Sequence, residues 1–69
     1  MNYPPKAYRS DDDPSTVYVL VPCGHFAALR LDGKWKRFSF TMGELEDHFR
    51  LIEEPGVALN LLKEAREAL

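Results

Sequence analysis

The sequence predicts a small α+β domain in which a three-stranded antiparallel β-meander is followed by two α-helices packed on one face (β-β-β-α-α). Three observations lead to this prediction. Two segments rich in β-branched and aromatic residues precede residue 41, and Asp32-Gly33 separates two of the expected strands as a hairpin turn would. Two apolar stripes at helical period follow Thr41.

Length and composition are those of one soluble globular domain. The chain has 69 residues, 45% of them hydrophobic and 29% charged, which leaves room for one core. The net charge of -2 argues against a strongly basic nucleic-acid binder. A single cysteine cannot form an intramolecular disulfide, and neither a signal-peptide pattern nor a run of 18 apolar residues is present. We therefore expect a cytoplasmic protein that does not enter a membrane.

Residues 1–15 are predicted to form an extended or flexible N-terminal arm, and residues 16–69 the single small domain. The arm contains Pro4, Pro5 and Pro14 together with three consecutive aspartates at 11–13. Proline removes a backbone donor and adjacent like charges repel, so no core pattern is expected there.

The expected strands occupy residues 17–21, 26–31 and 34–40. The first is a run of valine, tyrosine and leucine that ends at Pro22. A three-residue loop over 23–25 is expected to join it to the second strand, with Gly24 supplying a positive φ. Asp32-Gly33 then forms a two-residue turn into the third strand.

The two expected helices follow a capping box formed by Thr41 and Glu44. The first carries an apolar stripe and ends at Pro55-Gly56; its stripe residues are Met42, Leu45, Phe49 and Ile52. The second begins near Val57, and its stripe residues are Ala58, Leu61, Leu62, Ala65 and Leu69. Four charged residues of this helix are expected to point outward: Lys63, Glu64, Arg66 and Glu67.

These loop lengths divide the strand residues between two faces, because successive side chains alternate. The face that both helices are expected to cover consists of Val17, Val19, Val21, Ala27, Leu29, Leu31, Phe38 and Phe40. The other face carries Ala28 and the residues that we predict to bind a partner: Tyr18, Leu20, Phe26, Arg30, Trp35 and Arg37. Aromatic residues and arginine are typical of protein interface hot spots.

Four covers for this second face remain open from the sequence. They are the N-terminal arm, the second helix, a second copy of the chain in a homodimer, and a foreign protein.

The hairpin also has the one local pattern that resembles a nucleic-acid site. Four of the nine basic residues lie there, next to Trp35 and Phe38: Arg30, Lys34, Lys36 and Arg37. Aromatic stacking combined with phosphate contacts can hold a single strand on a sheet. However, Lys34 and Lys36 are expected to point to the opposite face from the two arginines.

Catalysis and metal binding are not indicated. Cys23-Gly24-His25 resembles one step of a RING-type zinc site, but a closed site needs four ligands, and His48 is the only other histidine. A nucleophilic Cys23 would need His48 as a base and Asp47 or Glu44 to orient it, and their spacing is not diagnostic. We expect no catalytic residue, no metal and no cofactor.

The sequence therefore favours a small non-enzymatic protein-interaction module that acts as a regulator or inhibitor. Compact chains of this kind are frequent among phage and mobile-element proteins that disable a host factor, although this is an association only. The alternative is a nucleic-acid-binding adaptor that uses the basic hairpin 30–37.

Overall fold

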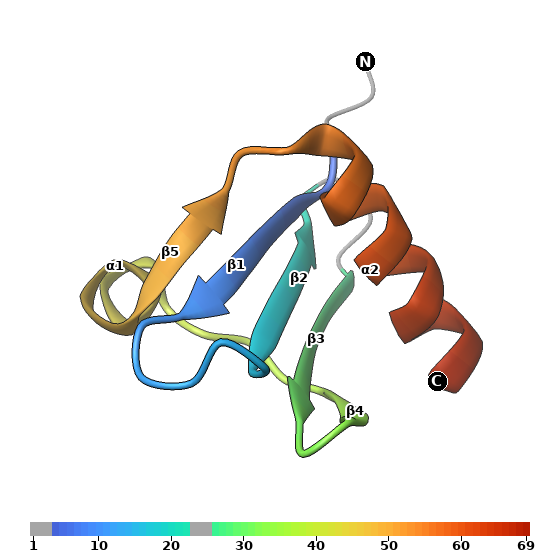
Figure 1. Ribbon diagram of the computed structural model, residues 1–69, viewed down its shortest axis with the longest axis horizontal. Helices are drawn as coiled ribbons and strands as arrows, with labels where there is room; N and C mark the ends of the chain where they lie inside the picture. Colours follow the sequence, from blue (N-terminus) through green and yellow to red (C-terminus); the bar gives the residue numbers. More distant parts are fainter. Residues whose placement is uncertain (1–3, 23–25) are drawn as a thin grey trace.

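The structure, a computed structural model, describes residues 4–22 and 26–69. The elements follow one another as β1 (Lys6–Ser10), β2 (Val17–Val21), β3 (Phe26–Leu31), β4 (Lys34–Arg37), α1 (Met42–His48), β5 (Phe49–Ile52) and α2 (Pro55–Ala68). The strands make one antiparallel sheet in the order β4-β3-β2-β1-β5 (Figure 1). The predicted α+β class with an antiparallel sheet and two helices is confirmed.

The prediction of a three-stranded sheet is wrong, because two strands lie in segments assigned to other structure. β1 lies within the predicted N-terminal arm; it is extended there, but it pairs with β2 on one side and with β5 on the other. Ala7 on β1 is fully buried. β5 occupies residues 49–52, which the apolar stripe assigned to the first helix. The N-terminal strand is therefore an inner strand of the sheet.

The turn between β3 and β4 has the predicted geometry. Asp32 and Gly33 have φ values of 52° and 77°. A two-residue hairpin turn with positive φ at both positions matches the right-handed twist of the strands. The pairing Leu31–Lys34, Arg30–Trp35 and Ala28–Arg37 follows from it as predicted.

The pairing of β2 with β3 differs from the prediction by one residue. Val21 pairs with Phe26, so four residues separate the strands instead of three. Cys23, Gly24 and His25, which carried the predicted three-residue loop, lie outside the described residues. Because side chains alternate along a strand, this shift places Val17 and Val19 on the face of Ala28 and Arg30 instead of the face of Leu29.

The two faces of the sheet are each covered by a different helix. One face, here called the α2 face, carries buried Ala7, Val17, Val19 and Ala28. Residues of α2 bond to Arg30 and Trp35 on this face, and Ala58, Leu62 and Ala65 of α2 are buried.

The opposite face, here called the α1 face, carries Tyr18 and Leu29, which pack with Leu45 of α1 in one buried cluster. Tyr8, Leu20, Ala27, Phe40 and Phe49 are partly buried against this cluster. The prediction that both helices pack on one face is wrong, because the register shift leaves both faces apolar and each needs a cover. Figure 1 shows α1 beside β5 and α2 on the other side of the view, where α2 packs against β1, β2 and β5.

The helix boundaries follow from local chemistry. The Thr41 hydroxyl accepts a hydrogen bond from the Glu44 backbone N–H at 3.2 Å, as the capping motif predicts. α1 ends after seven residues at His48, and Phe49 is extended. Pro55 lies in the first turn of α2, where its missing N–H removes no helical hydrogen bond. Pro55-Gly56 therefore begin the second helix; the prediction that they end the first one is wrong.

Candidate functional site

The six residues predicted to bind a partner do not share one face. Phe26, Arg30, Trp35 and Arg37 share one face, as predicted, because the β3–β4 register is the predicted one, but α2 covers this face, which the prediction left without a helix. Tyr18 and Leu20 lie on the α1 face, because the β2–β3 pairing is shifted by one residue. The structure thus divides the predicted set between two surfaces.

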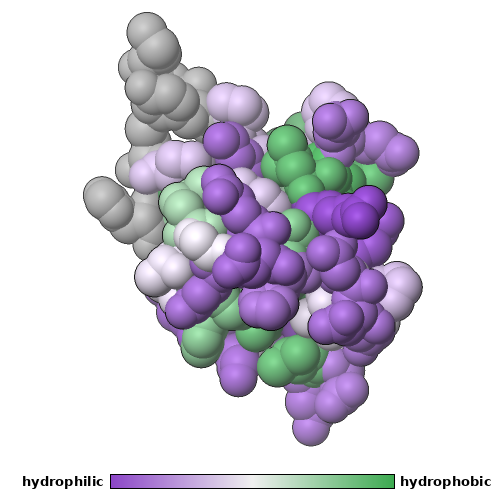
Figure 2. Space-filling model, turned by 90° about the vertical axis from the view of Figure 1, so that its left-hand side faces the viewer, coloured by the Kyte–Doolittle hydropathy of each residue, from purple (hydrophilic) through white to green (hydrophobic). Residues whose placement is uncertain are grey.

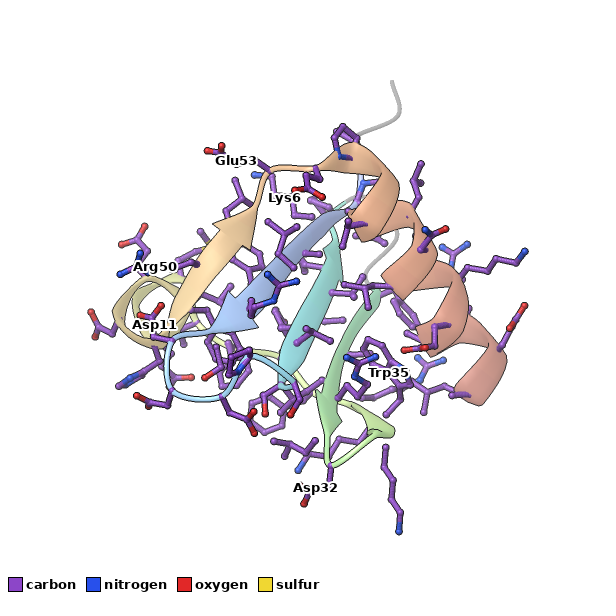
Figure 3. All side chains as sticks on the ribbon, viewed as in Figure 1. Lys6, Asp11, Asp32, Trp35, Arg50 and Glu53 are labelled. Carbon is purple, nitrogen blue, oxygen red and sulfur yellow. The ribbon has the colours of Figure 1, made fainter. Side chains whose placement is uncertain are left out.

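Arg30 and Trp35 are joined to α2 through a single carboxylate. Arg30 Nη1 donates to Glu64 Oε2 at 2.7 Å, and Trp35 Nε1 donates to the same oxygen at 3.0 Å. The Arg30 guanidinium also lies 5.7 Å from the Trp35 ring centroid, within cation–π range. Figure 3 shows Trp35 beside α2. Of the four covers left open by the sequence, the second helix is the one observed over these two residues.

Phe26 is flanked by two arginines from different elements. The Arg37 guanidinium from β4 lies 5.4 Å from the Phe26 ring centroid, and the Arg66 guanidinium from α2 lies 5.7 Å from it. Both distances allow cation–π attraction. This group joins β3, β4 and the C-terminal half of α2, and Arg37 and Arg66 remain exposed.

Tyr18 belongs to the core. It is 1% exposed, and its ring centroid lies 5.0 Å from that of Phe40 in an edge-to-face arrangement. Its hydroxyl accepts a hydrogen bond from the Phe40 N–H at 3.3 Å. Leu20 is partly buried against the same cluster. Both residues have a structural role on the α1 face that the predicted register did not include.

The lysines of the hairpin lie on the α1 face, opposite to Arg37, as predicted. Lys34 and Lys36 are exposed, and Lys36 Nζ lies 5.6 Å from the ring centroid of Phe38. Phe38 is 41% exposed and Leu31 is 40% exposed. The sequence assigned these two apolar residues to the covered face, but neither helix buries them.

Charge is distributed unequally between the two ends of the sheet. Six of the nine basic residues lie in β3, β4 and α2: Arg30, Lys34, Lys36, Arg37, Lys63 and Arg66. Eight of the eleven acidic residues lie in the β1–β2 connection, in α1 and directly after β5: Asp11, Asp12, Asp13, Glu44, Glu46, Asp47, Glu53 and Glu54.

The net charge of -2 therefore hides two ends of opposite sign. The segments from β3 through β4, together with α2 from Pro55 on, have three acidic residues and a formal charge of +3. The rest of the chain has three basic residues and a formal charge of -5. β4 and β5 are the two end strands of the sheet, so the charge separation follows the sheet order. Such a separation steers oppositely charged partners to different ends.

The residues considered for catalysis or metal binding do not form a site in the part of the chain that the structure describes. Cys23 and His25 lie outside it. His48 is exposed at the end of α1. Across residues 4–22 and 26–69, no three His, Cys, Asp or Glu side chains are placed to hold a metal ion.

A scan against protein-family models matched no family, and searches of the curated proteins and of the solved structures found no match for this chain. Within residues 4–22 and 26–69, neither helix is long and apolar enough to span a membrane.

Proposed function

We propose that this chain is a small non-enzymatic protein-interaction module, a regulator or inhibitor, that binds an acidic partner protein through the basic edge. The basic edge is defined as the β3–β4 hairpin with the exposed cations beside it: Lys34, Lys36, Arg37 and Arg66. The observation that carries this proposal is the formal charge of +3 in β3, β4 and α2 of an otherwise acidic chain.

The apolar residues of the hairpin favour a protein partner. Leu31 and Phe38 are about two-fifths exposed, and both are near exposed lysines in the chain. A protein interface combines an apolar centre with a polar and charged rim. Arg30 and Trp35 are not counted among the contact residues of this proposal, since both bond to Glu64, and their partner-binding role stays a prediction. The partner-binding role of Phe26 and Arg37 stays a prediction.

Nucleic acid is the alternative ligand, and the positions of the aromatic residues favour a protein partner over it. Holding a single strand requires aromatic rings on which successive bases stack. The Trp35 ring lies next to Arg30, and Trp35 Nε1 donates a hydrogen bond to Glu64. Phe38 is the most exposed aromatic residue of the hairpin region, so it alone would be left as an open stacking surface there. Lys34, Lys36 and Arg37 would contact phosphates in this alternative.

A charge-reversal pair tests the proposal. We expect Lys34→Glu combined with Lys36→Glu to abolish capture of a specific protein from a lysate of the native cell, both before and after nuclease treatment. Lys6→Glu, on β1, is the control for reversing an exposed lysine outside the basic edge.

Nuclease and salt separate the two ligands. If nuclease removes the captured material, and if log affinity for RNA or DNA falls steeply with log salt concentration, the adaptor alternative is correct. If Lys6→Glu weakens capture of the protein as much as the hairpin variant, the basic edge is not the binding surface.

A further inference from the structure

β5 is an end strand with an open outer edge. It pairs with β1 on its inner side, and among residues 4–22 and 26–69 no strand pairs with its outer side. The other end strand, β4, carries Lys34 and Lys36, and such charged side chains discourage a further strand from pairing. The one basic residue of β5, Arg50, is held by an ion pair with Asp11 at 2.8 Å. Figure 3 shows these two residues together at β5.

The hydrogen bonds of β1 reveal which backbone groups of β5 point outward. The Ser10 N–H donates to the Thr16 carbonyl on the β2 side at 3.0 Å, and the Asp11 N–H donates to the His48 carbonyl on the β5 side at 2.9 Å. In an antiparallel pair, hydrogen-bonded positions alternate along the strand. Arg9 and Ala7 therefore bond with Arg50 and Ile52, which they face. The N–H and C=O of Leu51, between these two positions, point away from β1.

Two hollows of the molecule lie at this strand. One, of about 530 Å³, is lined by Arg9, Ser10, Asp11 and residues 50–54. The other, of about 310 Å³, is lined by Pro4, Pro5, Lys6, Leu51, Ile52, Glu53, Pro55 and Ala58. Leu51 is 50% exposed and lines both. An added strand would direct alternate side chains to opposite sides of the sheet, and these hollows leave space beside β5.

The surface around β5 is mainly polar and acidic. Figure 2 views this side of the molecule and shows hydrophilic residues over most of it, with hydrophobic residues in separate areas. Glu53 and Glu54 follow β5 and line the larger hollow, and α1 before it contributes Glu44, Glu46 and Asp47. This surface favours recognition through the main chain and through charge over burial of a broad apolar patch.

We propose that the outer edge of β5 binds an extended, lysine- or arginine-bearing segment of a partner protein as a sixth strand. The main chain of the segment pairs with the N–H and C=O of Leu51, and its basic side chains lie near Glu53 and Glu54. This site lies at the opposite end of the sheet from the basic edge, in the part of the chain with the opposite formal charge. The inference does not depend on the partner proposed for the basic edge.

Substitutions of Leu51 test the main-chain contact. The probes are two blocked hexapeptides, one of alternating lysine and valine and one of alternating glutamate and valine, and binding is measured by fluorescence anisotropy. Leu51→Pro removes the outward N–H without breaking the bonds to β1, since proline is tolerated on an edge strand when its N–H would face solvent. We expect it to weaken binding of the lysine peptide about tenfold or more, through the lost hydrogen bond and the clash with an added strand.

Two controls separate the main chain from the side chain and from folding. Leu51→Ala keeps the N–H, so we expect it to weaken binding only about threefold or less through lost apolar contact. Glu53→Lys combined with Glu54→Lys reverses the local charge without a proline, and Glu67→Lys on α2 makes a charge change of the same kind at the other end. We expect Glu53→Lys combined with Glu54→Lys to abolish binding of the lysine peptide, and Glu67→Lys to preserve it. Far-ultraviolet circular dichroism checks the fold of each variant.

Four results would overturn the inference. These are absence of lysine-peptide binding at millimolar concentration, equal binding of the glutamate peptide, unchanged affinity in Leu51→Pro, and a dimer in sedimentation that Leu51→Pro dissociates, since a second copy would then occupy the edge. Leu51→Pro should leave protein capture by the basic edge intact, and Lys34→Glu combined with Lys36→Glu should leave binding of the lysine peptide to β5 intact. The two proposals can therefore fail separately.

Discussion

Replacing Glu64 with alanine should detach the second helix from the β3–β4 hairpin. The carboxylate oxygen Oε2 is the acceptor for Arg30 Nη1 at 2.7 Å and for Trp35 Nε1 at 3.0 Å, so one substitution removes both contacts. The Glu64 side chain is 52% exposed and the Arg30 side chain 24%, which means that water partly screens the ion pair.

The expected loss of stability is modest but measurable. An ion pair with this exposure contributes roughly 0.2–1 kcal/mol to the free energy of unfolding. The hydrogen bond from the indole adds about 1 kcal/mol, at the low end for charged acceptors because water reaches the carboxylate. Alanine regains a few tenths of a kcal/mol through its higher helix propensity, roughly the difference between two good helix formers. The net decrease should be about 1–2 kcal/mol.

Urea unfolding followed by circular dichroism measures this change, and Glu67→Ala is the matched control. Glu67 lies on the same helix, is exposed, and its side chain makes no hydrogen bond to the described residues, so its replacement should be neutral or slightly stabilising. Combining Glu64→Ala with Trp35→Phe isolates the indole contact, since phenylalanine keeps most of the ring and lacks the N–H. Equal effects of the two alanine variants, together with strict additivity of Glu64→Ala and Trp35→Phe, would refute the reasoning.

Three further predictions concern the fold. Deleting residues 1–10 should prevent folding, because β1 is an inner strand that carries the fully buried Ala7, and its loss leaves β2 and β5 without their shared partner; a folded deletion protein in circular dichroism and amide NMR spectra would contradict this. Tyr18→Phe should lower the free energy of unfolding by roughly 1–2 kcal/mol, because the Phe40 N–H loses its acceptor in a partly buried place; urea unfolding with the stability of the wild type would argue against that bond. The Asp13 carboxylate accepts hydrogen bonds from the hydroxyl and backbone N–H of Ser15 and from the Thr16 hydroxyl, and these bonds hold its pKa below the ordinary value of 3.8. The carboxylate therefore stabilises the fold at neutral pH, and this contribution is lost as the pH falls through the lowered pKa. Ser15→Ala removes the hydroxyl and keeps the backbone N–H, so it should raise the pKa of Asp13 part of the way toward 3.8 in an NMR titration of the carboxyl carbon; an unchanged pKa would show that the Ser15 hydroxyl is not a cause.

The features predicted correctly from the sequence are those with local causes. The Asp32-Gly33 turn fixes the β3–β4 register because few residues adopt positive φ at two successive positions. The Thr41 cap fixes the start of α1 because its hydroxyl satisfies a backbone donor three residues on. Neither depends on a distant part of the chain.

The features predicted wrongly depend on contacts between distant segments. Phe49 and Ile52 fit a helical stripe and also fit a strand, and a short apolar segment does not separate the two periods. Residues 49–52 form a strand because their backbone pairs with β1. β1 in turn has only five residues, one of them Ala7, so its apolar pattern is weak until β2 and β5 lie on both sides of it. Residues 6–10 read Lys-Ala-Tyr-Arg-Ser and do not alternate between apolar and polar, so periodicity gives no signal for this strand.

The small size of the chain explains why several aromatic and arginine residues of the predicted contact set also hold the fold together. A domain of 69 residues has little interior, so aromatic residues that resemble a hot spot are used to join its own layers. Tyr18 packs beneath α1, and Arg30 and Trp35 bind α2 through Glu64. With both faces of the sheet carrying helices, the two end strands retain free backbone groups and exposed charge. This arrangement favours partner binding at the edges of the sheet, where the charges of +3 and -5 are separated, over binding across its faces.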